Sequence, residues 1–293
     1  MLFRTLSCAL MVATLSVASA QAFALEAPEL PILRETFAST VPTKYQIALT
    51  PELQAAQNAA IKSYPEVQAL TAPEFLVVVN RHPKAQSLSI VVTDGKTVEY
   101  IGSAKVSTGD LKRKKHFSTP LGLFENKREF GNYRAEGTKN ENGVRGYGKK
   151  GMRVYDFGWQ ESTASWGAGL PAQIRLQMHA TDPDVLEARL GAPASQGCVR
   201  IQTSVNTFID QYGVMDKNYV PSATDAPGWV LSKTKKLDKY DGRYMIVMEH
   251  APTAIVVPTL QTLTTVPQML LKAPTANALV ASVGTTPIFS APK

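Results

Sequence analysis

The segment at residues 87–107, SLSIVVTDGKTVEYIGSAKVS, decides the fold class of this chain. Two runs rich in β-branched residues lie on either side of the dipeptide Asp94-Gly95. Asp-Gly between two such runs is a strong signal for a tight β-hairpin, because the favoured hairpin turn needs residues that accept a positive φ. Another apolar run, FLVVVN at 75–80, precedes the hairpin. We therefore predict a β-sheet that is built around this hairpin.

Three further runs have the composition of strands, and they lie at 151–159 (GMRVYDFGW), 173–179 (QIRLQMH) and 243–250 (RYMIVMEH). The clear helical pattern is TSVNTFIDQYG at 203–213, which has Thr203 or Ser204 as its candidate N-cap. Strands at this spacing without intervening amphipathic helices favour a sandwich or a small barrel. The predicted fold is mainly β: an antiparallel β-sandwich or partly closed barrel with a few helices.

Composition divides the chain into four parts. Residues 1–24 have the layout of a secretory signal peptide, with Arg4 before a short apolar run and small residues at Ala-x-Ala sites. Residues 25–74 contain helical stretches and are expected to form an N-terminal arm, which leads into the main domain at 75–250. A Pro/Thr/Ala-rich tail follows at 251–293. We therefore expect an exported protein of the periplasm or the cell wall.

The two cysteines lie in different parts of the chain. Cys8 lies inside the predicted signal peptide, so the mature protein keeps only Cys198. Exported proteins normally use their cysteines in pairs, as disulfides. An unpaired Cys198 therefore favours a chemical role, and an inert buried cysteine is the alternative.

The chain is basic, with a formal net charge of +7 and a sequence pI near 9.3. The densest cluster of cations is LKRKKHF at 111–117. Export argues against nucleic acid as the partner and favours anionic wall polymers, lipid headgroups or carboxylate-bearing peptides. A solvated loop without a specific partner is an equally good interpretation of this cluster.

The stretch MHATDPDVLEARLGAPASQGCVRI at 178–201 combines a histidine with the remaining cysteine. A cysteine attacks as its thiolate, which needs a nearby base or positive charge, and His179 is the candidate base for Cys198. Gly197 lets a substrate approach the thiol, and the N–H groups of Gly197 and Cys198 are candidate donors to an oxyanion. The other histidines lack the spacing of a metal site, so we predict no metal and no cofactor.

These residues resemble the catalytic domain of the L,D-transpeptidases (YkuD-type) of bacterial cell walls. The resemblance rests on His179, the fifteen residues that follow it, and then the element SQGCVR at 195–200. VSTG at 106–109 and STPLG at 118–122 support it, and the similarity covers roughly residues 75–213. Two positions depart from the common pattern, since Ala180 replaces a frequent Gly and Gln196 a frequent His.

The resemblance implies covalent acyl transfer on peptidoglycan stem peptides, which act as donor and acceptor. Cys198 is then the nucleophile, and His179 is the base and acid. Arg200 points to the same side as Cys198 in an extended segment, where it holds a donor carboxylate or braces the loop through a salt bridge. Ser195 orients His179 or satisfies a turn. Thr181 matches a residue that members of the family often have in the loop after this histidine.

Three functions remain open from the sequence. The first is a wall cross-linking L,D-transpeptidase. The second is a related L,D-carboxypeptidase or hydrolase, or a transferase that joins a wall-anchored protein to peptidoglycan. The third is a non-catalytic wall-binding module, in which Ala180 and Gln196 mark lost activity.

Overall fold

The computed structural model describes residues 27–167, 169–220 and 228–252. The predicted signal peptide and nearly all of the predicted tail lie outside these residues. In chain order the helices and strands are α1 (Glu29–Thr40), η1 (Thr43–Tyr45), α2 (Pro51–Lys62), α3 (Pro65–Gln68), β1 (Glu74–Asn80), β2 (Ser87–Thr93), β3 (Val98–Lys105), β4 (Gly122–Glu125), η2 (Arg128–Phe130), β5 (Tyr133–Arg134), β6 (Arg153–Thr163), β7 (Pro171–Ala180), η3 (Glu187–Arg189), β8 (Val199–Ile201), α4 (Thr203–Gln211), η4 (Gly228–Val230) and β9 (Tyr244–Met248).

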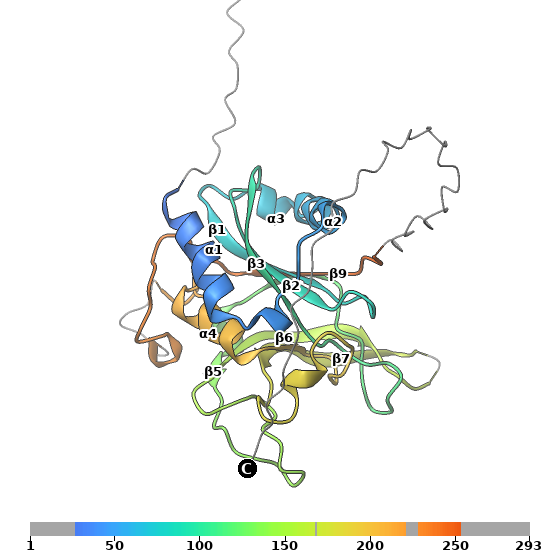
Figure 1. The fold of residues 1–293 in the computed structure, drawn as a ribbon. Helices are drawn as coiled ribbons and strands as arrows, with labels where there is room; N and C mark the ends of the chain where they lie inside the picture. The colour runs from blue at the N-terminus through green and yellow to red at the C-terminus, as the bar shows by residue number, and fades with distance from the viewer. Residues whose placement is uncertain (1–26, 168, 221–227, 253–293) are drawn as a thin grey trace, which may run out of the picture. The chain divides into compact units, whose positions relative to one another are not determined.

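The strands form two sheets, with the orders β3-β2-β1-β9-β4 and β5-β6-β7-β8. They lie as separate layers in Figure 1. Most neighbouring strands are antiparallel, including β2 and β3 on either side of Asp94-Gly95. Two pairs are parallel, namely β1 with β9 and β7 with β8.

The predicted mainly β fold is confirmed, and the sheets differ from the prediction in detail. Both are mixed rather than purely antiparallel, and in the described residues neither closes into a barrel. Parallel pairs need long connections, such as residues 181–198 between β7 and β8, and the composition of a strand does not reveal its partner.

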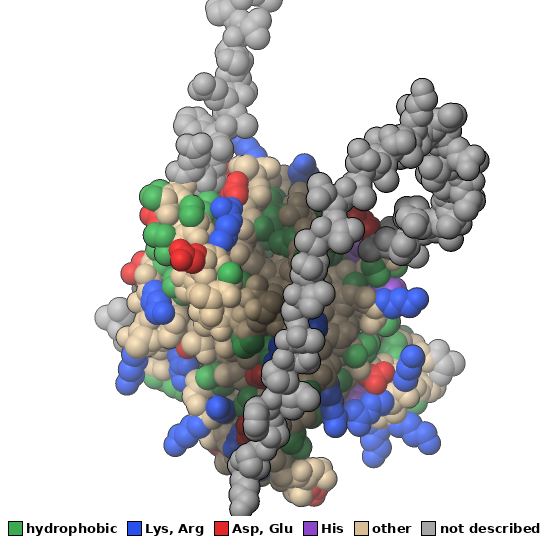
Figure 2. Space-filling view, viewed as in Figure 1, with side chains coloured by type: hydrophobic (Ala, Val, Ile, Leu, Met, Phe, Trp, Pro, Cys, Tyr) green, Lys and Arg blue, Asp and Glu red, His purple; other side chains and the backbone are tan. Residues whose placement is uncertain are grey.

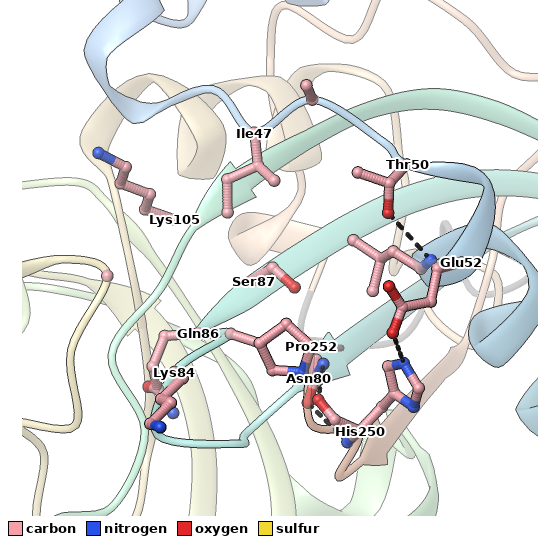
Figure 3. Close-up of a pocket in the computed structure, with 14 residues that line it drawn as sticks. Ile47, Thr50, Glu52, Asn80, Lys84, Gln86, Ser87, Lys105, His250 and Pro252 are labelled. Carbon is pink, nitrogen blue, oxygen red and sulfur yellow. Dashed lines mark hydrogen bonds and ion pairs between the residues drawn. The ribbon is translucent and has the colours of Figure 1, made fainter. Parts of the chain in front are cut away.

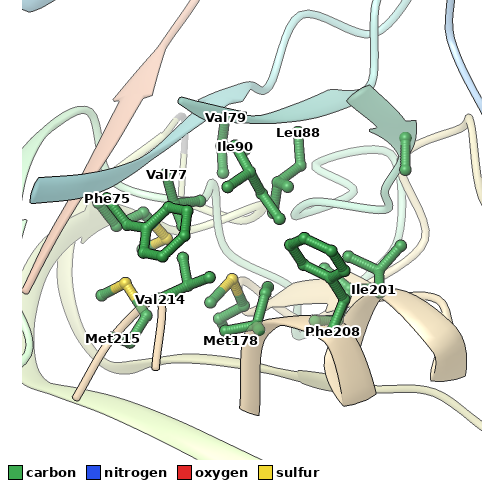
Figure 4. Packing of buried hydrophobic residues seen from close by; sticks show 14 of the residues in the cluster. Phe75, Val77, Val79, Leu88, Ile90, Met178, Ile201, Phe208, Val214 and Met215 are labelled. Atoms are coloured by element: carbon green, nitrogen blue, oxygen red, sulfur yellow. The ribbon is translucent and has the colours of Figure 1, made fainter. Parts of the chain in front are cut away.

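The main hydrophobic core lies between the two sheets. Figure 4 shows side chains of both layers meeting there, with Phe208 of α4 beside them. Helix α1 closes the same core through Leu30, Leu33 and Phe37, and the rings of Phe37 and Phe208 meet edge to face at 5.3 Å between centroids. The core residues labelled in Figure 4 are Phe75, Val77, Val79, Leu88, Ile90, Met178, Ile201, Phe208, Val214 and Met215.

A second cluster covers the opposite face of the first sheet. Ile61 of α2 and Val67 beside it in α3 pack there against Leu76, Val78 and other strand residues. The first sheet is thus covered on both faces, and every residue of β1 and β2 is buried. This explains why these strands are almost continuously apolar in sequence.

Helix α4 begins where the sequence predicts, but its N-cap differs. Gln202 is the N-cap, and its side-chain oxygen accepts hydrogen bonds from the N–H groups of Ser204 and Val205 at 2.6 and 3.2 Å. The prediction of Thr203 or Ser204 as the cap is therefore wrong. The hydroxyl of Thr203 instead donates to the carboxylate of Glu187, which fastens α4 to the loop before β8.

One charged group is fully buried beside α4. The guanidinium of Arg153 donates to Asp216 at 3.2 Å and lies over the rings of Tyr155 and Tyr219. Burial raises the pKa of Asp216 to about 6, although the Arg153 charge opposes this rise. An ion pair without access to water depends on both partners, because either charge left alone is strongly disfavoured.

We predict that Arg153→Leu lowers the free energy of unfolding by about 3–5 kcal/mol, because Asp216 is left buried without its counter-charge. Urea denaturation of both proteins measures the difference. Lys127→Ala is the control, since the exposed pair of Lys127 with Glu129 is worth less than about 1 kcal/mol. Equal losses for the two variants would contradict this role of Arg153.

Candidate active site

The register of β7 and β8 decides where the predicted catalytic residues lie. Met178 pairs with Val199 and His179 pairs with Arg200, and the strands run parallel. Met178 and Val199 both point into the core. Because side chains alternate along a strand, His179, Arg200 and Cys198 all emerge on the opposite face of the sheet. The structure therefore places Cys198, directly before β8, on the same side of the sheet as His179 of β7.

The imidazole of His179 is held in one tautomer. Its Nδ1 lies 2.7 Å from the carbonyl oxygen of Ala180, which can only accept, so Nδ1 carries the proton and Nε2 keeps a free lone pair. The ring is only 3% exposed. Burial lowers the pKa of His179 to about 4, with a smaller contribution in the same direction from the Arg200 charge. His179 is therefore a neutral base at neutral pH.

Cys198 is half-buried and has no disulfide partner. Burial raises the pKa of its thiol, whereas the backbone N–H of Gln177 and the charge of Arg200 act in the opposite direction. The sequence led us to expect a thiol whose pKa is lowered by its neighbours. Desolvation outweighs those neighbours, so the thiol and the imidazole are both neutral at rest.

The loop before Cys198 is fixed by its own hydrogen bonds. The hydroxyl of Ser195 donates to the carbonyl of Cys198 at 2.6 Å and accepts from the N–H of Gly197 at 3.0 Å. Ser195 thus satisfies the turn, and no hydrogen bond joins it to His179 among the described residues. The N–H of Gly197 is occupied within the loop, so its predicted role as an oxyanion donor is not supported by this geometry.

Gly197 has a structural role instead. Its φ of +130° lies in the region that favours glycine, and a Cβ there would come within 2.7 Å of Ile174. Its carbonyl accepts a hydrogen bond from Thr119, and Nδ1 of His116 lies 2.7 Å from the carbonyl of Ser195. Thr119 thus holds this loop, a role that was not predicted although STPLG contains the residue.

The two other predicted substrate-binding residues have different environments. Arg200 donates to the carbonyl of Ala194 at 3.2 Å, its Nε is buried without a partner, and no ion pair involves it among the described residues. The predicted salt bridge at Arg200 is therefore not found. Thr181 is 1% exposed, and its N–H donates to Ile201, so it supports the strand end and cannot contact a substrate in this structure.

A buried carboxylate beside the thiol was also missed. Asp156 of β6 accepts from the side chains of Arg175 and Gln177, both at 2.7 Å, and its charge raises the pKa of Cys198. Asp156 and Gln177 are buried polar residues between apolar neighbours in β6 and β7. A polar residue at such a position is the signal that would have identified them.

A loop at 140–151 covers the histidine. The ring of Tyr147 meets that of His179 edge to face at 4.6 Å, and it also contacts Tyr133. The loop is fastened next to the site, because the backbone N–H of Arg145 donates to Asp182 at 2.7 Å. Tyr147 therefore limits access to the imidazole. Elsewhere, the described residues hold no cluster of His, Cys, Asp or Glu that could bind a metal ion.

We predict that Gly197→Ala displaces Cys198, because the new methyl group requires an unfavourable φ and collides with Ile174. The rate of Cys198 alkylation by iodoacetamide should change several-fold while the far-ultraviolet circular dichroism stays the same. Gly228→Ala is the matched control, since a Cβ at Gly228 meets no atom of the described residues within 4 Å. Unchanged alkylation in Gly197→Ala would show that the loop tolerates the substitution.

Comparison with solved structures gives weak likenesses only. A fused zinc-dependent amidase/peptidase with a peptidoglycan-binding domain from Clostridium acetobutylicum is 14% identical, over 71% of this chain and 66% of that one, with a TM-score of 0.30. Bd1075 from Bdellovibrio bacteriovorus is 14% identical over 62% and 52%, with a TM-score of 0.32. The helical cell-shape determining protein Pgp2 from Campylobacter jejuni is 13% identical over 67% and 56%, with a TM-score of 0.30.

This chain thus spans between 52% and 66% of the length of those proteins. TM-scores near 0.3 carry no argument about the function of this chain. Comparison with curated proteins gave no match. The model of the L,D-transpeptidase catalytic domain matches residues 74–220, which is half of the chain. The match includes both His179 and Cys198, and the chain belongs to the L,D-transpeptidase catalytic domain family.

Proposed function

We propose that this protein is a peptidoglycan L,D-transpeptidase that uses Cys198 as its nucleophile and His179 as its general base. The observation that carries the proposal is the register of β7 and β8, which brings both side chains to one sheet face. Family membership supports the reaction class. The free lone pair on Nε2 of His179 supports its role as the base.

The first step is acylation of the thiol. Nε2 of His179 takes the proton from Cys198 as the sulfur attacks the carbonyl carbon before the donor's terminal D-amino acid. A C–S bond forms and the C–N bond breaks. The proton on Nε2 passes to the leaving amine, so His179 returns to its neutral form. Because both groups start neutral, proton transfer accompanies the attack and no resting ion pair is needed.

The second step transfers the acyl group to an amine. The side-chain amine of a second stem attacks the thioester, a C–N bond forms and the C–S bond breaks. His179 takes a proton from the attacking amine and returns it to the sulfur. Among the donors to the oxyanion, the backbone N–H of Cys198 remains our candidate, because that of Gly197 is bonded to Ser195.

The setting of this activity is also a proposal. Residues 1–24 act as a signal peptide, 25–74 as an arm, 75–250 as the catalytic domain and 251–293 as a tail. The mature protein is then exported to the periplasm or cell wall, where stem peptides or a wall-anchored protein serve as acceptors. Among the described residues, no helix has both the length and the hydropathy that crossing a bilayer requires.

Intact-mass spectrometry of the protein beginning at Leu25, mixed with a tetrapeptide stem, tests the proposal directly. We expect a mass increase equal to the acyl tripeptide, and none in Cys198→Ala. His179→Gln should slow acylation by about 100-fold or more, since general-base catalysis contributes 10²–10⁴-fold. His82→Gln is the control. An adduct of the same size on Cys198→Ala would refute the nucleophile.

The products separate the related functions. A cross-linked dimer supports the transpeptidase, whereas a tripeptide alone supports the hydrolase. Transfer to a lysine-bearing protein and not to stems supports a protein-to-peptidoglycan transferase. A protein that binds stems without any acylation is a wall-binding module, and that result would overturn the proposed reaction.

The pH profile of acylation gives an independent prediction. Protonation of His179 removes the base, and its pKa is lowered by burial to about 4. Activity should therefore persist below the ordinary histidine pKa of about 6.5 and fall by half near pH 4. Single-turnover rates between pH 3.5 and 8 measure this, with circular dichroism as the control for folding. Half-loss near pH 6.5 would mean that His179 is solvated in the active protein.

A further inference from the structure

A cationic cavity lies next to the loop that carries Cys198. It has a volume of about 550 Å³, and residues 188–194 form one wall. The cations that line it are Lys105, Arg113 and Arg189, and we call this cavity the arginine furrow. A smaller cavity of about 310 Å³ also has Lys105 in its lining. Figure 3 shows that Lys105 and Lys84 lie along the same side of this smaller cavity.

The floor of the arginine furrow is fixed by backbone hydrogen bonds. The N–H of Gly191 donates to Val106 at 2.7 Å, and that of Ala194 donates to Thr108 at 3.0 Å. The hydroxyl of Ser107 donates to the carbonyl of Arg189 at 3.2 Å. The backbone of this wall is thus held in place, whereas the side chains of Arg113 and Arg189 are exposed and can adjust to an anion.

The charges in the furrow are not compensated by the protein. Among the described residues no ion pair involves Lys105, Arg113 or Arg189. The acidic residue of the lining, Asp110, accepts a hydrogen bond from the backbone N–H of Lys112. Burial lowers the pKa of Arg200, the charge of Cys198 opposes this, and the charges of Arg113 and Arg189 lower it further. The charges of Arg113, Arg189 and Arg200 therefore act on one another, and none of the three makes an ion pair among the described residues.

Arg200 connects the furrow to the active site. It shares the sheet face of His179 and Cys198, and it reaches over to the carbonyl of Ala194 in the furrow wall. Its Nε is buried without a partner. Arg200 would thus lie between the thiol and an anion bound in the furrow. The anion would lie beside the position of the donor and would not occupy that position.

The chemistry of the furrow selects a carboxylate. Planar guanidinium groups bind carboxylates through paired charge-assisted hydrogen bonds, and a volume of several hundred Å³ suits a peptide end. The acceptor in the proposed reaction is a stem peptide, which carries carboxylates as well as the attacking amine. We propose, as an extension of the proposed function, that the arginine furrow binds a carboxylate of the acceptor stem and so delivers its amine to the Cys198 thioester.

The reaction itself is unchanged by this binding. The acceptor amine forms the new C–N bond, the C–S bond of the thioester breaks, and the amine's proton returns to sulfur through His179. The acceptor carboxylate is neither made nor consumed. Its role is to hold the amine near the thioester in competition with water.

The test separates loading from transfer. A tetrapeptide donor with acetylated amines loads Cys198 but cannot accept, and an acceptor stem is then added either with free carboxylates or with amidated carboxylates. In the wild type, the acid should reach half-maximal transfer at a concentration about tenfold lower than the amide. In the double variant Arg113→Gln/Arg189→Gln the acid should lose this advantage, and transfer should fall more than loading.

Lys62→Gln/Lys96→Gln is the matched control, because it removes the same charge from exposed positions on α2 and in the β2–β3 turn. The proposal is overturned if the wild type uses acid and amide equally, or if the furrow variant behaves like the control. It is also overturned if loading and transfer fall equally, since the furrow would then serve the donor or the fold.

Failure of the proposed function would give a different experimental result. If stems never load wild-type Cys198, the transpeptidase reaction is wrong, and titration calorimetry of Cys198→Ala protein still decides the furrow. Binding of the acid acceptor that weakens about tenfold on amidation, and again on removal of both arginines, supports the site. Binding that is absent, or insensitive to both changes, overturns it.

Discussion

The parallel register between β7 and β8 is the constraint on which the candidate site depends. It fixes Met178 and Val199 in the core, and so sends His179 and Cys198 to the other face of the same sheet. A shift of one residue would place the sulfur in the core. The core between the sheets therefore holds the geometry of the candidate site in place, and this links the stability of the fold to the proposed reaction.

Local patterns were enough to predict β1, β2, β3, β6, β7 and β9, because alternating or continuous apolar runs and the Asp94-Gly95 turn act over a few residues. They did not predict the short strands β4, β5 and β8. The spacing of His179 and SQGCVR was enough to identify the family, and the catalytic roles of His179 and Cys198 stay a prediction. The parallel pairings were not predictable, since residues 181–198 give no signal for where the chain returns. The N-cap of α4 was predicted wrongly, because Ser and Thr are more usual N-caps than Gln. Gln202 nevertheless caps the helix, since its side chain accepts hydrogen bonds from the first turn.

The environment of the candidate site could not be predicted from the sequence, for a physical reason. Whether the thiol pKa rises or falls depends on the balance between desolvation and charges that only the fold brings together. The same holds for the N–H of Gly197, which turns towards Ser195, and for Thr181, which supports a strand end. The arginine furrow likewise combines residues from 105–113 and 188–194, which are far apart along the chain.

The raised pKa of Cys198 has a consequence for the lifetime of the enzyme. Oxidants such as peroxides react with thiolates, and an unpaired thiolate outside the cytoplasm is converted to sulfenic acid or to a mixed disulfide. A thiol that stays protonated until a substrate arrives escapes most of this damage. The burial that raises the pKa of Cys198, and that leaves its deprotonation to His179 in the proposed mechanism, would thus also preserve the sulfur between reactions in the oxidising compartment proposed for it.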